Sequence, residues 1–160
     1  MPKAFLKEEQ RTRVAQPNIF MNGIVLASSQ GDDASNLHAL LAGSAWKLIA
    51  VPTCSDAAWA IRHLRVPIVL CDLTLEDQPW QQTLRMLRRA RNRTCVIFLS
   101  NEPDTDLAGE VAKGGGFDLL VRPFERAQVL QSLFFAYGQY KLTSTSCFLG
   151  RMENSRIARL

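Results

Sequence analysis

Polar residues of the types needed for ion pairing or metal binding follow several short apolar runs of the sequence. They are Ser28 and Ser29, Asp72, Ser100, and Arg122 together with Pro123. Mg²⁺ prefers carboxylate oxygens in near-octahedral geometry, so the hydroxyls of Ser28 and Ser29 are poor ligands for it. Arg122 is permanently charged and forked, so it can pair with the Asp72 carboxylate through two hydrogen bonds. We expect an internal Arg122–Asp72 pair; the alternative is that Arg122 points to solvent.

The apolar runs before these residues have the character of buried parallel strands. They cover Gly23–Ala27, Lys47–Val51, Pro67–Cys71, Cys95–Leu99 and Asp118–Val121. Runs that are continuously apolar, rather than alternating, are typical of strands covered on both faces. Five such runs alternating with helical periodicity predict an α/β, flavodoxin-like doubly wound parallel sheet in the order 2-1-3-4-5. In such a sheet, ligands bind outside the carboxyl ends of the strands, where the polar residues stand.

The segments between the strands place apolar residues three and four positions apart, as amphipathic helices do. The stripes are Leu37, Leu40, Leu41; Ala57, Ala60, Ile61, Leu64; Trp80, Leu84, Leu87; Leu107, Ala108, Val111, Ala112; and Leu130, Leu133, Phe134, Tyr137. Ser55 is the expected N-cap of the second helix, and Gly114–Gly116 should end the fourth. Pro123 should end the fifth strand before the last helix.

In the polar residues at the carboxyl ends of its predicted strands, the sequence resembles the receiver domains of response regulators. Receivers carry an acidic pair after the first strand, a phospho-accepting Asp after the third, Ser or Thr after the fourth, and Lys-Pro after the fifth. The matching segments here are Ile68–Leu75, Val96–Ser100 and Gly115–Phe124. The resemblance covers about residues 23 to 140, and four matching pieces in the right order make it fairly specific.

The resemblance implies acyl-phosphate chemistry, in which a carboxylate attacks a phosphohistidine or small phosphodonor with the help of Mg²⁺. It assigns the phosphoacceptor position to Asp72 and the phosphate-sensing positions to Ser100 and Arg122-Pro123. Ser28 and Ser29 stand at the acidic-pair positions, which makes the metal site degenerate. We therefore predict no bound metal or other cofactor, although the family uses Mg²⁺.

Two acidic residues follow the first strand at a distance. Asp32 and Asp33 lie four residues beyond Ser28 and Ser29 and could swing back toward the crevice. We expect them instead at the start of the first helix, where the positive end of the helix dipole favours carboxylates. Asp72 would then be the one carboxylate of the crevice, and a pair with Arg122 would leave the site neutral.

The bond between Arg122 and Pro123 is expected to be cis. Receivers turn this corner with a cis Lys-Pro that directs the basic side chain into the crevice. A cis bond also reverses the chain within two residues at the end of a buried strand, although only about 5–6% of X-Pro bonds in folded proteins are cis.

The charge of the chain lies mainly in its ends. Residues 1–22 carry four basic and two acidic groups (+2), and residues 141–160 carry four and one (+3). Because the whole chain is +4, residues 23–140 carry −1. We expect a basic N-terminal arm (1–22), one receiver-like domain (23–140) and a basic C-terminal tail (141–160), with both arms solvated or disordered.

The remaining composition indicates an ordinary globular domain. The four cysteines, Cys54, Cys71, Cys95 and Cys147, lack metal or redox spacing, so we expect free thiols. No apolar run is long enough for a membrane helix, and residues 1–16 do not have the pattern of a signal peptide. We therefore expect a cytoplasmic protein. Five arginines cluster in one segment, which we interpret as the solvent-exposed face of a helix: Arg85, Arg88, Arg89, Arg91 and Arg93.

Three function classes remain open. The preferred one is a receiver module of a two-component phosphorelay, not an enzyme, whose partner would be a histidine kinase or phosphotransfer protein. The alternative is a docking or dimerisation module without phosphotransfer, acting through the face of the fourth helix, fifth strand and fifth helix, where Phe134, Phe135 and Tyr140 lie. A flavin or nucleotide carrier is disfavoured because Asp32 and Asp33 would repel phosphate near Gly31. The arms are too short for a DNA-reading domain, so no nucleic-acid partner is expected.

Overall fold

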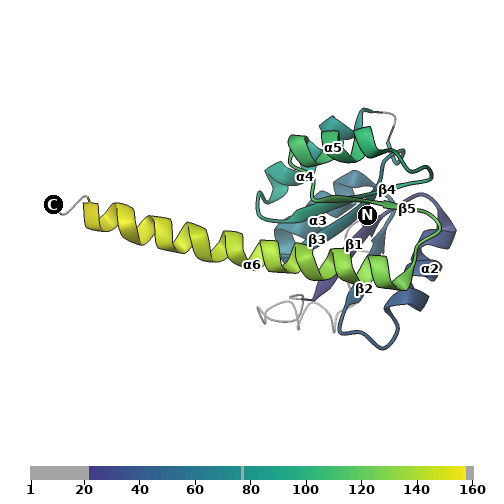
Figure 1. The fold of residues 1–160 in the computed structure, drawn as a ribbon, viewed down its shortest axis with the longest axis horizontal. Coiled ribbons are helices and arrows are strands. Elements are labelled where there is room, and N and C mark those ends of the chain that lie inside the picture. The colour runs from purple at the N-terminus through teal and green to yellow at the C-terminus, as the bar shows by residue number, and fades with distance from the viewer. Residues whose placement is uncertain (1–21, 77, 158–160) are drawn as a thin grey trace.

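The computed structural model describes residues 22–76 and 78–157, with side chains described as far as Thr143. The strands are β1 (Gly23–Ala27), β2 (Lys47–Val51), β3 (Ile68–Asp72), β4 (Cys95–Ser100) and β5 (Asp118–Val121). The helices are α2 (Gly31–Leu41), α3 (Cys54–Leu64), α4 (Trp80–Ala90), α5 (Thr105–Gly114) and α6 (Arg126–Ile157). All strand pairs are parallel, in the order β2-β1-β3-β4-β5, which confirms the predicted topology (Figure 1).

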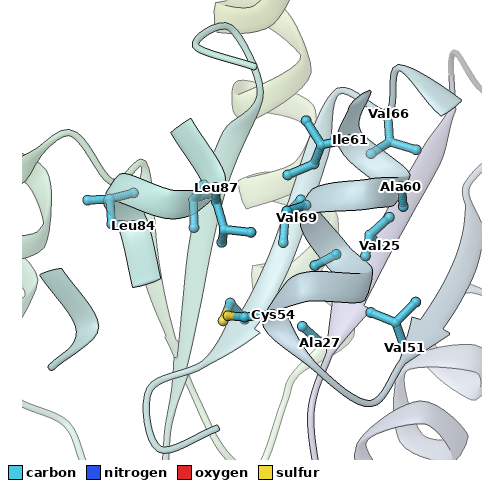
Figure 2. Close-up of a cluster of buried hydrophobic side chains, with 14 of the residues drawn as sticks. Val25, Ala27, Val51, Cys54, Ala60, Ile61, Val66, Val69, Leu84 and Leu87 are labelled. Atoms are coloured by element: carbon cyan, nitrogen blue, oxygen red, sulfur yellow. The ribbon is translucent and has the colours of Figure 1, made fainter. Parts of the chain in front are cut away.

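Helices cover both faces of the sheet, and the strands supply alternate residues to two cores. Val25 and Ala27 of β1 face a core formed with α3, α4 and Val111 of α5 (Figure 2). Ile24 and Leu26 face the opposite core, which is formed with α2 and α6. The continuous apolar character of β1, β3 and β4 therefore has the predicted cause, burial on both sides, whereas the edge strands β2 and β5 are only partly buried.

Strand register brings the polar residues to one edge of the sheet. Ala27, the last residue of β1, pairs with Cys71, and Asp72 pairs with Leu99. Ser100, the last residue of β4, pairs with Val121. Both β3 and β4 end one residue later than predicted, so Asp72 and Ser100 are the final residues of their strands.

Two helix ends test the predicted signals. The N-cap of α3 is Thr53, whose side chain accepts a hydrogen bond from the Asp56 backbone N–H, so the prediction of Ser55 was wrong by two residues. The glycine stop is confirmed, because α5 ends at Gly114 and Gly115 takes the left-handed conformation with φ 102°. That conformation strains any residue with a Cβ, which explains a glycine there.

The last helix continues beyond the predicted domain. The backbone of residues 141–157 is helical and continuous with α6, where the sequence analysis expected a solvated or disordered tail; Figure 1 shows this helix projecting past the sheet. The segment contains no proline and one glycine, so nothing in it stops a helix. The predicted N-terminal arm lies outside the described residues, except for Asn22.

Three of the four cysteines, Cys54, Cys71 and Cys95, are free thiols, as predicted, and all three are buried. Burial raises the pKa of the Cys95 thiol to about 11, which disfavours the reactive thiolate. The side chain of Cys147 lies outside the described part of the chain. Among the described residues, no helix has the length and apolar character required to span a membrane.

Candidate functional site

Arg122 stands at the centre of the crevice at the carboxyl edge of the sheet and binds two carboxylates at once. Its Nη2 lies 2.6 Å from Asp33 Oδ2 and 2.6 Å from Asp72 Oδ2. Its Nε donates to Asp33 Oδ1 at 2.9 Å, and its Nη1 donates to Asn101 Oδ1 at 3.1 Å. The Phe124 ring centroid lies 5.6 Å from the guanidinium carbon and covers it further. The guanidinium is therefore held by Asp33 at the start of α2, Asp72 at the end of β3 and Asn101 directly after β4, rather than by Asp72 alone.

The predicted Arg122–Asp72 pair forms, but its expected geometry was wrong. The two-bond fork goes to Asp33, and Asp72 receives one bond from Arg122. Asp33 lies in the first turn of α2, as expected, yet its side chain is only 3% exposed and faces the crevice. Leu37 and Leu41, one and two turns later, are buried on the same side of the helix. The row of buried residues at Leu37 and Leu41, continued four residues toward the N-terminus, reaches Asp33 and would have predicted that its side chain is buried.

Both oxygens of the Asp72 carboxylate are fully engaged. Oδ1 accepts hydrogen bonds from the backbone N–H and the hydroxyl of Thr74, each at 2.8 Å. Oδ2 accepts from Arg122 and from Gln30 Nε2, the latter at 3.2 Å. Asp72 is only 3% exposed. Gln30 and Thr74 were not identified from the sequence, because amides and hydroxyls in loops carry no pattern that distinguishes them.

The environment of Asp33 stabilises its charge. Burial raises the pKa of the Asp33 carboxyl, but hydrogen bonds from Arg122 and Ser28 and the charge of Arg122 outweigh burial, so the pKa lies below its ordinary value. Ser28 Oγ donates to Asp33 Oδ2 at 2.6 Å. The hydrogen bond to Asp33 raises the pKa of Arg122 against the opposing effect of burial. The ionised pair is therefore the stable state of the site.

The other predicted residues divide between the site and its rim. Ser28 belongs to the site through Asp33, whereas Ser29 is exposed. Ser100 Oγ donates to the Glu102 backbone carbonyl and accepts from the Glu102 N–H, so its hydroxyl is engaged by its own loop. The Arg122–Pro123 bond is cis, as predicted.

The donor set does not fit Mg²⁺. Asp33 and Asp72 are two carboxylates, not the one that the sequence analysis expected, and with Arg122 they give the crevice a formal charge of −2 + 1 = −1 rather than zero. The Arg122 Nη2 is in contact with one oxygen of each carboxylate, so the guanidinium already supplies the positive charge between them. In the described part of the chain, no group of three or more acidic, histidine or cysteine side chains is arranged to hold a metal.

Comparisons with known proteins agree with this fold. No family model matches the chain. It is 26% identical over 111 residues to the transcriptional regulatory protein ZraR of Klebsiella oxytoca, a match that covers 66% of this chain. The chain spans about a quarter of the length of that relative, since the match covers 25% of it.

Solved structures give a stronger likeness in shape than in sequence. The signal receiver domain of a putative LuxO repressor protein from Vibrio parahaemolyticus superposes with a TM-score of 0.70 at 20% identity, covering 79% of this chain and 97% of that one. The beryllofluoride-activated NtrC4 receiver domain dimer gives 0.68 at 20% identity, covering 75% and 99%. The chain is therefore a domain with the receiver fold, similar to the receiver domains of two-component response regulators.

Proposed function

We propose that this domain is a receiver-type signalling module that acts by docking to a protein partner, without phosphotransfer or enzymatic turnover. The observation that carries the proposal is the state of Asp72, whose two oxygens accept four hydrogen bonds and which is only 3% exposed. A carboxylate must present a free oxygen to attack phosphorus. Here Arg122 holds one oxygen and Thr74 holds the other.

The electrostatics of the crevice support the same proposal. A phosphodonor is anionic and approaches a site that already carries a formal charge of −1 from Asp33, Asp72 and Arg122. Receivers of the family use Mg²⁺ to neutralise that repulsion, and the donor set here does not fit the ion. The Asp33–Arg122–Asp72 triad would therefore hold the module in one state.

The face made by α5, β5 and α6 offers an apolar surface for docking. Phe134 and Phe135 of α6 are 73% and 55% exposed, and their ring centroids lie 5.8 Å apart. Beside Phe135 is an open groove of about 690 Å³ whose lining includes Phe117 and Leu119. Exposed apolar surface of this kind marks interaction sites on proteins. The similar NtrC4 receiver is a dimer, so a second copy is one candidate partner for this face.

Phosphotransfer to Asp72 is the competing function. It is favoured by one observation, the position of Asp72 at the carboxyl end of the central strand β3, beside Ser100 at the end of β4. In that case a histidine kinase or a phosphotransfer protein would be the partner of the module.

Intact-mass spectrometry after incubation with phosphoramidate or acetyl phosphate and Mg²⁺ separates the two functions. We expect no phosphoryl adduct on the wild-type chain under conditions that phosphorylate a control receiver with a complete acidic pair. An adduct that disappears in Asp72→Asn would overturn the docking proposal and establish the competing one. An adduct that persists in Asp72→Asn would be reaction at another residue and would leave Asp72 unmodified, as proposed.

A further inference from the structure

Residues 78–101 form a strongly basic stretch within an otherwise acidic domain. They contain five arginines and no aspartate or glutamate, so their net charge is +5. Because residues 23–140 together carry −1, the remainder of that region carries −6. Three of the five arginines, Arg85, Arg88 and Arg89, lie on α4, and the first turn of that helix contains no acidic residue. The positive charge of the domain is therefore concentrated at α4.

The fold uses only one of these three arginines. Arg88 Nη1 donates to the Gly115 backbone carbonyl at 3.3 Å, so this side chain links α4 to the end of α5. Arg85 and Arg89 are exposed, and among the described residues neither side chain takes part in a hydrogen bond or an ion pair. They lie one helical turn apart, where like charges destabilise a helix. A bound anionic group would relieve that repulsion.

A groove of about 510 Å³ lies beside these side chains. We call it the α4 groove, and its lining includes Trp80, Leu84, Arg85, Arg88 and Arg89. The end of α5 reaches the groove at Gly114, where an added Cβ would be 3.4 Å from the Trp80 ring. In Figure 1, α4 and α5 lie together on one side of the sheet. None of the described residues that line the groove is acidic, so it combines apolar surface from Trp80 and Leu84 with a basic rim.

We propose that the α4 groove binds a short acidic segment of another protein, with carboxylates on Arg85 and Arg89 and an apolar side chain against Trp80. A guanidinium pairs with a carboxylate through two parallel hydrogen bonds, which favours arginine where acidic groups are recognised. The charge of the surrounding domain limits the length of the partner. A long polyanion would extend beyond the groove and meet the −6 of the remaining residues, whereas a short acidic segment keeps its charge within the basic rim.

A nucleic acid matches the groove less well. Proteins that bind single strands combine a basic track along many phosphates with aromatic rings on which the bases stack. Trp80 is the one aromatic side chain among the described lining residues. Its ring lies against Gly114 and makes an edge contact with Phe98, with the centroids 5.7 Å apart. These contacts leave Trp80 half-buried, which suits contact with an apolar side chain better than stacking of a base.

The α4 groove is separate from the α5–β5–α6 face proposed for docking, and the inference does not depend on whether Asp72 is phosphorylated. Contacts between exposed charges are screened by salt. Binding in the α4 groove should therefore weaken as the salt concentration rises, whereas an apolar contact through Phe135 should not.

Fluorescence anisotropy of a labelled peptide built from repeats of Glu-Glu-Leu-Leu, titrated with the full chain at low and high salt, tests the inference. We expect saturable binding that salt weakens. Arg85→Glu/Arg89→Glu should weaken it by about tenfold or more, because two attractive charge pairs become repulsive. Lys47→Glu, an exposed reversal on β2 with the same change of charge as either single variant, should stay within about twofold of the wild type. A peptide of Glu-Glu-Gly-Gly repeats should bind more weakly, because it lacks the apolar side chain.

Two further measurements locate the contact and check the fold. Binding of the unlabelled peptide should change the tryptophan fluorescence of the wild type and not that of Trp80→Phe, although Trp46 and Trp59 remain in the variant. Circular dichroism melts of the double arginine variant should match the wild type, since both positions are exposed.

Four results would overturn the inference. The first is the absence of saturable binding, and the second is binding that the double arginine variant leaves unchanged. The third is binding that is lost in Phe135→Ala and kept in the double arginine variant, because the contact would then belong to the α5–β5–α6 face. The fourth is binding of a labelled oligothymidylate at least as tight as that of the Glu-Glu-Leu-Leu peptide, which would assign the groove to nucleic acid.

Discussion

Two sets of arginines in this small domain are used in opposite ways. Arg122 lies in the crevice, where it donates four hydrogen bonds to Asp33, Asp72 and Asn101 and its side chain is only 14% exposed. Arg85 and Arg89 lie on α4, exposed and without an ion pair in the described part of the chain. The comparison shows that an arginine can stabilise the interior of a domain where carboxylates compensate its charge. Where they do not, its charge stays exposed on the surface.

The largest expected effect comes from removing the compensated arginine. Arg122→Ala leaves Asp33 and Asp72 buried beside each other without a counter-charge, and breaking a buried pair in this way costs roughly 3–5 kcal/mol. Urea denaturation at neutral pH measures the loss in the free energy of unfolding. Arg89→Ala is the matched control, with an expected change within about 0.5 kcal/mol because its side chain is exposed. Equal losses in the two variants would remove the distinction between the two sets.

A smaller effect is expected from Asp33→Asn, which keeps the shape of the side chain and removes its charge. Hydrogen bonds to charged groups contribute about 1.5–3 kcal/mol, and we expect a loss of that size at pH 7. The pKa of folded Asp33 is lowered, so its contribution is present above the pKa of the unfolded chain, about 4, and is lost as the pH falls through the lower folded value. The difference between wild type and variant in urea midpoints should therefore shrink below about pH 4. A difference that grows on acidification would contradict the lowered pKa.

Two glycines, one within α5 and one directly after it, give a third test. In Gly115→Ala the alanine would have to keep a φ of 102°, which strains any residue with a Cβ, and the new Cβ would also force the end of the Arg88 side chain to move, so we expect destabilisation of about 1–3 kcal/mol. Gly109→Ala, in the middle of the same helix, meets nothing within 4 Å and should stabilise the domain by about 0.5–1 kcal/mol. Thermal melts of the pair should move in opposite directions. Shifts of the same sign would show that one of the two backbone arguments is wrong.

The fold could be predicted almost completely because its signals are local and redundant. Strands such as Cys95–Ser100 are almost continuously apolar, and the helices carry apolar residues at regular three- and four-residue steps. Gly115 follows the end of α5 because the left-handed conformation there favours glycine. The continuation of α6 to Ile157 was missed because charge was taken as a sign of disorder, although a charged segment without proline can remain helical.

The site could be predicted only in part, because its geometry depends on side-chain direction. Asp72 and Arg122 were placed correctly by their strand ends, but the partner that binds Arg122 most fully, Asp33, is 89 residues away in sequence. Its inward direction follows from the burial stripe of α2 and not from its position at a helix start. Gln30 and Thr74 were missed because a loop amide or hydroxyl has no periodic signal that identifies its contacts.

The smallest expected effect is the response of the crevice to Mg²⁺, and it tests the compensated arginine most directly. Titration of the wild type with Mg²⁺ should give no saturable change in tryptophan fluorescence, with Trp80, which packs against Phe98 of β4, as a reporter near the acceptor loop. The reason is that the Arg122 Nη2 already contacts one oxygen of each carboxylate, so an ion would have to displace a guanidinium held by Asp33, Asp72 and Asn101. Tight, saturable binding that Asp33→Ala abolishes would show that the two carboxylates accept a divalent cation despite the arginine. Saturable binding that is unchanged in Asp33→Ala and Asp72→Ala would place the ion outside the crevice and leave the triad as described.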